Sequence, residues 1–101
     1  RLRDRFHNTA ASASAAFHLG RMASDEAGDY ALAESWFTTY LTEAGNSGPL
    51  ASEALGRAME CADKSGAADR AQLYASLYLK TYPDGPLAQR ARALAEGAAT
   101  P

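Results

Sequence analysis

The chain has 101 residues but no valine, no isoleucine and only one cysteine, Cys61. Because strands are normally built from β-branched and aromatic residues, the first two absences argue against a β-sheet. Alanine, the best helix former, makes up about a quarter of the residues, so the composition predicts an all-α protein. A single cysteine excludes an internal disulfide and a zinc site built from cysteine pairs.

The sequence also lacks an excess of basic charge and a long apolar run. The formal net charge is −2, whereas nucleic-acid binding needs a concentrated basic face. The longest segment without a charged residue, Phe6 to Gly20, contains several polar residues. The sequence therefore predicts neither nucleic-acid binding nor membrane insertion within this chain.

Two interlocking repeats run through the sequence. Gly28, Ala33, Trp36 and Tyr40 recur 38 positions later as Gly66, Ala71, Tyr74 and Tyr78, and Gly48-Pro49-Leu50-Ala51 recurs 37 positions later as Gly85-Pro86-Leu87-Ala88. A period of this length predicts a stacked array of small helical units rather than one closed core. Such an array favours binding over catalysis.

Apolar spacing and helix-ending residues predict five helices. Asp29 is the expected N-cap of the second helix, Pro49 the expected first residue of the third, and Gly45, Gly66 and Pro83 mark helix ends. The expected helices cover about residues 2–26, 30–44, 49–65, 68–82 and 86–96.

Leu19-Gly20, Gly28-Asp29-Tyr30, Ala33 and Phe37 look like the tetratricopeptide repeat pattern, and Leu55-Gly56, Gly66, Ala71 and Pro83 resemble a second copy. The resemblance implies one domain over residues 1–97, with a tail at 98–101. It divides the domain into repeat one at about 2–45, repeat two at about 49–83 and a closing helix at about 86–96. The sequence departs from the family in three ways. The segment from Leu19-Gly20 to Gly28 is one residue longer than usual and that from Leu55-Gly56 to Gly66 about three residues longer, Tyr40 and Tyr78 stand where the family has alanine, and the period exceeds the family's usual length of about 34.

The segment from Tyr78 to Ala88 is similar to the phrase that joins repeats in bacterial envelope proteins. These proteins include the TolA-binding cell-division coordinator, the tetratricopeptide lipoprotein of outer-membrane assembly and the tails of anti-sigma regulators. The likeness favours the cell envelope or periplasm, with the cytoplasm as the alternative. Because the sequence begins at Arg1 rather than Met, we expect a fragment or processed product of a larger bacterial protein.

In the family, the first helix of each pair lines a concave groove that holds a partner segment. The resemblance implies that the groove residues are Phe17, Arg21, Ser24, Glu53, Arg57, Glu60 and Arg90, with Cys61 at the edge. Arginines recurring once per repeat suit a peptide carboxylate or an acidic side chain. The alternative is an ordinary salt-bridged surface, because Glu53, Arg57 and Glu60 lie at helical spacing for ion pairs.

Chemistry-bearing residues are few. His7 and His18 lie about 16 Å apart along a helix, too far for one metal ion. Cys61 is expected to be a small buried residue rather than a nucleophile. Asp25 and Glu26 lie at a helix C-terminus, where carboxylates oppose the helix dipole, and a basic partner would account for them. The aromatic residues of the second and fourth helices, including Tyr82, are expected in the core rather than in a ligand cage.

These observations predict a non-enzymatic protein–protein interaction module without metal or cofactor, whose partner is a protein or peptide segment. The alternative is a homo-oligomeric assembly domain that stacks through apolar surface exposed at its repeat ends, since the array has only two full repeats and one helix.

Overall fold

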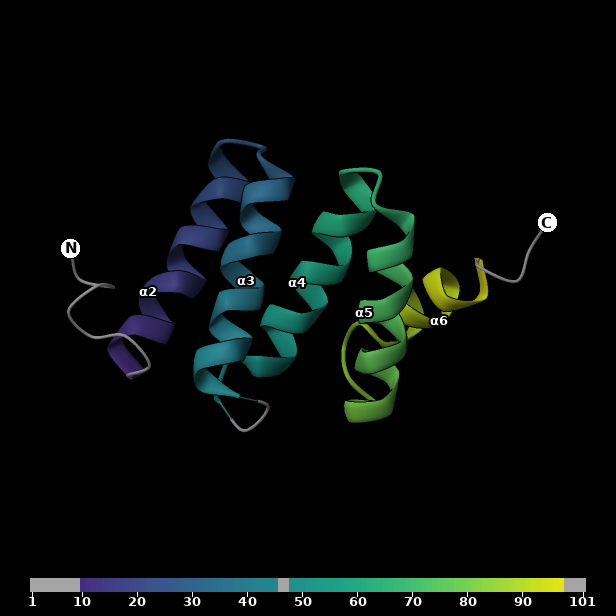
Figure 1. Cartoon of the computed structure of the whole chain (residues 1–101). Coiled ribbons are helices and arrows are strands. Elements are labelled where there is room, and N and C mark those ends of the chain that lie inside the picture. The colour runs from purple at the N-terminus through teal and green to yellow at the C-terminus, as the bar shows by residue number, and fades with distance from the viewer. Residues whose placement is uncertain (1–9, 46–47, 98–101) are drawn as a thin grey trace.

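The computed structural model describes residues 10–45 and 48–97, and every regular element within them is helical. This confirms the expected all-α class. Each helix packs mainly against the next one in the chain, so the elements follow one another across the molecule (Figure 1). They are α2 (Ala10–Arg21), the π-helical segment η1 (Met22–Glu26), α3 (Tyr30–Ala44), α4 (Ala51–Lys64), α5 (Ala68–Thr81) and α6 (Ala88–Gly97).

Two helix starts differ from the prediction. Pro49 is not the first residue of a helix, because α4 begins at Ala51 with Leu50 as its N-cap. In the same way, Pro86 lies in a turn and α6 begins at Ala88. The backbone explains both shifts, because the N–H groups of Ala51 and Ala88 donate to the carbonyls of Gly48 and Gly85 in tight turns.

The turn between α4 and α5 has the geometry that its sequence predicts. Gly66 has φ +83°, a left-handed conformation that glycine adopts without steric cost. The N–H of Ala67 donates to the carbonyl of Ala62, and that of Gly66 donates to Asp63. This pair of bonds is a Schellman motif, which satisfies carbonyls at the end of α4.

The turn between α2 and α3 is similar but one residue wider. The N–H of Ala27 donates to the carbonyl of Met22, and that of Asp29 donates to Ala23. Because a π-turn closes over five residues instead of four, η1 holds one residue more than an α-helical turn. The single helix expected to reach Glu26 is therefore α-helical only to Arg21. Asp29 is the N-cap of α3, as predicted, and its carboxylate accepts from the N–H of Leu32 at 3.2 Å.

The core consists of many alanines and a few large rings. In the first cluster Phe17 makes edge-to-face contacts with Phe37 and Tyr40, at centroid distances of 5.5 and 5.7 Å. A second cluster is built around Tyr78, Leu55 and Met59. Small residues let helix backbones approach closely, and the rings fill the space between them. Of the aromatic residues expected in the core, Phe37, Tyr40 and Tyr78 are buried there. The others, Trp36, Tyr74 and Tyr82, are partly buried against the two clusters.

The two Gly-Pro turns, residues 48–51 and 85–88, are stabilised by equivalent hydrogen bonds from the backbone to a tyrosine. The backbone N–H of Leu50 donates to the Tyr40 hydroxyl at 2.9 Å, and that of Leu87 donates to Tyr78 at 3.1 Å. A Cβ at position 48 would lie 2.7 Å from the Tyr40 hydroxyl. A Cβ at Gly85 would likewise overlap the Tyr78 hydroxyl. Glycine is thus required at both turns so that a tyrosine can reach the backbone.

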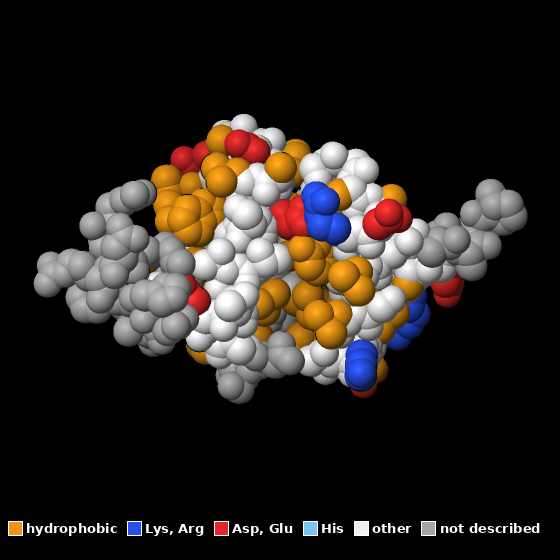
Figure 2. All heavy atoms as spheres, viewed as in Figure 1, with side chains coloured by type: hydrophobic (Ala, Val, Ile, Leu, Met, Phe, Trp, Pro, Cys, Tyr) orange, Lys and Arg blue, Asp and Glu red, His pale blue; other side chains and the backbone are white. Residues whose placement is uncertain are grey.

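A buried carboxylate links α3 to α5. Glu34 is 6% exposed, and it accepts from Arg70 Nε at 2.7 Å and from the Tyr74 hydroxyl at 2.7 Å. Burial acts to raise the pKa of Glu34, but the hydrogen bonds from Arg70 and Tyr74 outweigh it and hold the pKa below its usual range. Figure 2 shows acidic and basic side chains side by side near the middle of the molecular face that it presents. Arg70 and Tyr74 follow Glu34 by 36 and 40 positions in the sequence. Their hydrogen bonds therefore fix α5 relative to α3.

Among the described helices, none has the length and apolar character needed to cross a membrane. The predicted start of the first helix near Leu2, Phe6 and His7 lies outside the described residues, as do Arg1 and the 98–101 tail.

Candidate binding cleft

A cleft of about 310 Å³ opens between η1, the start of α3 and α4. We call it the η1–α4 cleft. Its polar wall combines two basic and two acidic side chains with a hydroxyl, an aromatic ring and a thiol. The lining residues are Ser24, Asp25, Tyr30, Arg57, Glu60, Cys61 and Lys64.

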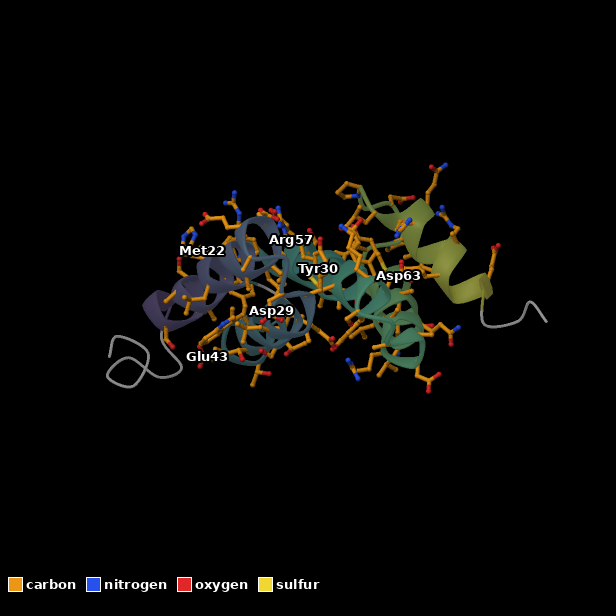
Figure 3. The ribbon with its side chains drawn as sticks, turned by 90° about the horizontal axis from the view of Figure 1, so that it is seen from above. Met22, Asp29, Tyr30, Glu43, Arg57 and Asp63 are labelled. Carbon is orange, nitrogen blue, oxygen red and sulfur yellow. The ribbon has the colours of Figure 1, made fainter. Side chains whose placement is uncertain are left out.

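Arg57 forms ion pairs with two acidic side chains at the cleft. Its Nε donates to Glu53 Oε2 at 2.9 Å, and its Nη1 lies 3.5 Å from Asp25 Oδ1. The guanidinium carbon lies 5.9 Å from the centre of the Phe37 ring, within cation–π range. Figure 3 shows Arg57 next to Tyr30, with Met22 toward α2 and Asp63 toward α6. Arg57 therefore connects the π-helical segment to α4 at the centre of the molecule.

Lys64 and Tyr30 form the other side of the cleft. The Lys64 ammonium lies 5.1 Å from the centre of the Tyr30 ring, so the ring face stabilises the cation. The contact leaves the ammonium without an ion-pair partner within the described part of the chain. A carboxylate entering the cleft would thus meet one cation already paired, Arg57, and one without an acidic partner, Lys64.

Cys61 lies in the wall of the cleft and is 4% exposed, which confirms the expectation of a small buried residue. Burial raises the pKa of the Cys61 thiol to about 11. The thiol is thus protonated at neutral pH, and only the thiolate is a good nucleophile. No histidine is among the lining residues.

The π-helical geometry of η1 shapes the near wall of the cleft. The Ser24 hydroxyl donates to the carbonyl of Arg21 at 3.3 Å and lies 3.1 Å from Asp25 Oδ1. These contacts hold Asp25 toward Arg57 on α4. The wider turn thus places a carboxylate across the cleft from its guanidinium partner, which accounts for one of the two acidic residues at this helix end.

Apart from Phe17, the structure separates the predicted groove residues into three places. The η1–α4 cleft brings together Ser24, Arg57 and Glu60, and Glu53 is bound to Arg57. Arg21 is exposed in a neighbouring hollow beside His18 and Met22. Arg90, on α6, donates to Asp63 Oδ2 at 3.0 Å. The three arginines therefore do not share one cavity.

Phe17 is not a groove residue. Its side chain is 2% exposed and packs between Phe37 and Tyr40 in the core. The family position that suggested a surface contact is here occupied by a ring that the two facing aromatics enclose. An apolar contact from Phe17 to a partner would require the core to open.

Sequence reasoning missed two residues of the cleft, Tyr30 and Lys64, and the bridge from Glu34 to Arg70. One sequence signal pointed to Glu34. It lies three residues before Phe37 and seven before Leu41, on the apolar face of its helix. A carboxylate at such a position indicates a buried partner. Tyr30 gave no comparable signal, because its role depends on how α3 meets α4.

Comparisons of this chain with protein-family models, with curated proteins and with solved structures found no significant match.

Proposed function

We propose that this protein is a non-enzymatic interaction module of the tetratricopeptide-like kind, which binds a segment of another protein in the η1–α4 cleft. In this proposal α2–α3 and α4–α5 are antiparallel helix pairs, and α6 is the first helix of a third, incomplete unit. The single observation that carries the function is the cleft itself, where charged side chains from two successive units line one cavity.

Recurring contacts support the proposed repeat. The Tyr40–Leu50 hydrogen bond has its counterpart in Tyr78–Leu87, at offsets of 38 and 37 residues. The π-helical segment also accounts for the extra residue between Leu19-Gly20 and Gly28, because a π-turn holds one residue more than an α-turn. The two tyrosines and the extra residue before Gly28 thus have specific structural reasons, which are compatible with the family architecture.

The chemistry of the cleft favours a partner segment that carries a carboxylate, either as an acidic side chain or as a chain end. Lys64 offers an ammonium, and Arg57 offers the guanidinium nitrogen that is 3.5 Å from Asp25. Because that distance is longer than a strong charge-assisted hydrogen bond, a peptide carboxylate can compete for the position. Asp25 and Glu60 would in turn select against a purely acidic segment.

Catalysis is not part of the proposal, because the cleft holds a protonated, buried thiol and no imidazole. The phrase from Tyr78 to Ala88 extends the proposal to a bacterial envelope protein, where similar repeat domains occur.

The test selects binding peptides and asks whether they need the cleft. A phage-displayed library of random peptides is selected against the immobilised protein, and the best sequence is labelled for fluorescence anisotropy. The variants are Arg57→Ala, Lys64→Ala and, as a control of the same charge change, Lys80→Ala on the exposed surface of α5. We expect the two cleft variants to weaken binding about tenfold or more and Lys80→Ala to leave it unchanged. Equal affinity for all four proteins would contradict the proposal.

A further inference from the structure

An apolar hollow of about 360 Å³ lies on the other side of η1 from the cleft. Three of its large side chains are exposed, with Leu19 at 36%, Met22 at 52% and Leu32 at 47%. Figure 2 shows apolar side chains gathered over the upper part of α2. We call this surface the Met22 face; its lining residues are Leu19, Met22, Ala23, Glu26, Ala27, Leu32 and Trp36. Exposed apolar surface of this kind marks an interaction site.

Position in the repeat indicates that the Met22 face is a helix-docking surface. Arg70 and Tyr74 are the residues through which α5 contacts Glu34 on α3. The residues 38 positions earlier are Leu32 and Trp36, and both line the Met22 face. The positions that α5 uses to meet a preceding helix are thus apolar on α3, where Leu32 is exposed and Trp36 is partly buried against the core.

Charges beside the Met22 face are arranged so that the surface complements itself. His18 and Arg21 are the basic residues in the last turn of α2, and Asp25 and Glu26 follow them in η1. Neither Arg21 nor Glu26 forms an ion pair within residues 10–45 and 48–97. Glu26 also lies at a helix C-terminus, where its charge opposes the dipole. A cation from outside the described chain would relieve that repulsion.

We propose that the Met22 face is the interface of a symmetric dimer of this chain. In a two-fold interface the same surface is used by both copies. Two α2–η1 segments running in opposite directions about an axis near Met22 bring the basic end of one copy against the acidic end of the other. Arg21 then meets the partner's Glu26 twice, once on each side of the axis, while Leu19, Met22 and Leu32 bury their apolar surface. The dimer leaves the η1–α4 cleft open.

The first test measures self-association by sedimentation equilibrium at protein concentrations up to about 1 mM. The full chain is compared with Met22→Glu and with the matched control Leu73→Glu, which changes an exposed leucine on α5 outside the Met22 face. We expect a monomer–dimer equilibrium for the full chain and Leu73→Glu, and a monomer for Met22→Glu. Circular dichroism checks that each variant remains helical.

A charge-swap test is specific for the proposed symmetry. Arg21→Glu and Glu26→Arg each place like charges across the axis, so each variant alone should dimerise about tenfold more weakly. When the two are mixed, opposite charges face each other at both contacts, and the heterodimer should form with about the affinity of the unchanged protein. Because this rescue requires two different chains, a role of these residues within one chain cannot produce it.

Three results would overturn the dimer proposal. They are a full chain that is monomeric at the highest concentration, a Leu73→Glu variant that weakens association as much as Met22→Glu, and a charge-swapped mixture that associates no better than its components. The outcome is independent of the proposed function, because peptide binding in the η1–α4 cleft can be measured on the monomeric Met22→Glu variant.

Discussion

The hydroxyl of Tyr40 accepts a hydrogen bond from the backbone N–H of Leu50 at 2.9 Å, and this contact closes the turn that leads into α4. The same bond recurs between Tyr78 and Leu87 at the turn into α6. A tyrosine at this position therefore has a structural role that a smaller residue cannot perform. It fixes where the next helix begins.

Replacing either tyrosine by phenylalanine should have the same cost, because both hydroxyls serve the same backbone position. Tyr40→Phe and Tyr78→Phe are each expected to lower the free energy of unfolding by about 0.5–1.5 kcal/mol, the net value of one hydrogen bond. Urea titration followed by circular dichroism measures the effect. The control is Tyr30→Phe, whose hydroxyl has no hydrogen bond within the described residues, and it should be neutral. A cost at only one of the two turns would contradict their equivalence.

Gly85 is required by the ring that it faces. In Gly85→Ala the new Cβ would overlap the Tyr78 hydroxyl, so the ring must move and the bond to Leu87 must lengthen. We expect a loss of about 1–3 kcal/mol in the free energy of unfolding. Asp84→Ala, at the exposed neighbouring position, should change stability by less than about 0.5 kcal/mol. If the two variants are equally stable, the close approach has no energetic importance.

The bridge from Glu34 should make stability depend on pH in the acidic range. The pKa of Glu34 is lower in the folded protein than its ordinary value of 4.5, so the carboxylate stabilises the fold above that pH. The contribution is lost as the pH falls below 4.5 and through the folded pKa. Glu34→Gln should cost about 1–2 kcal/mol at pH 7, and this difference from the unchanged protein should shrink as acid is added. A difference that does not change with pH would show that the charge has no role.

Cys61 should be unreactive until the protein unfolds. Its pKa of about 11 and its burial leave almost no accessible thiolate at pH 8. Labelling with Ellman's reagent is expected to be slow in buffer, where opening of the α4 region sets the rate. It should be fast in urea, where the protein is unfolded. Rapid labelling of the folded protein would contradict the burial of this thiol.

Much of the helical framework can be predicted from the sequence because its signals are local. The Asp29 cap, the left-handed Gly66 and the proline-limited end of α5 depend only on neighbouring residues. The sequence predicts the starts of α4 and α6 too early, since proline at a helix start and proline in the preceding turn satisfy the same local rules. The structure decides between them through the tyrosine hydroxyls, which come from a different helix.

The candidate site was less predictable, because it depends on contacts between helices. The family resemblance predicts Arg57 and Glu60 as groove residues, whereas Lys64 enters the cleft only because the Tyr30 ring lies opposite. Phe17 lies in the core instead of in a groove, since a family position states which helix face a residue occupies but not whether a neighbour covers it. The π-helical segment was visible only as one extra residue, which alone does not specify a π-turn.

The most direct test of the central claim maps a selected peptide onto the folded protein by the chemical-shift changes of its backbone amides. The account predicts that the largest changes fall on Ser24, Tyr30, Arg57 and Lys64, which line the η1–α4 cleft. They should be absent in Arg57→Ala. Changes concentrated instead on Leu73 and Leu77, the exposed leucines of α5, would contradict it and place the binding surface elsewhere.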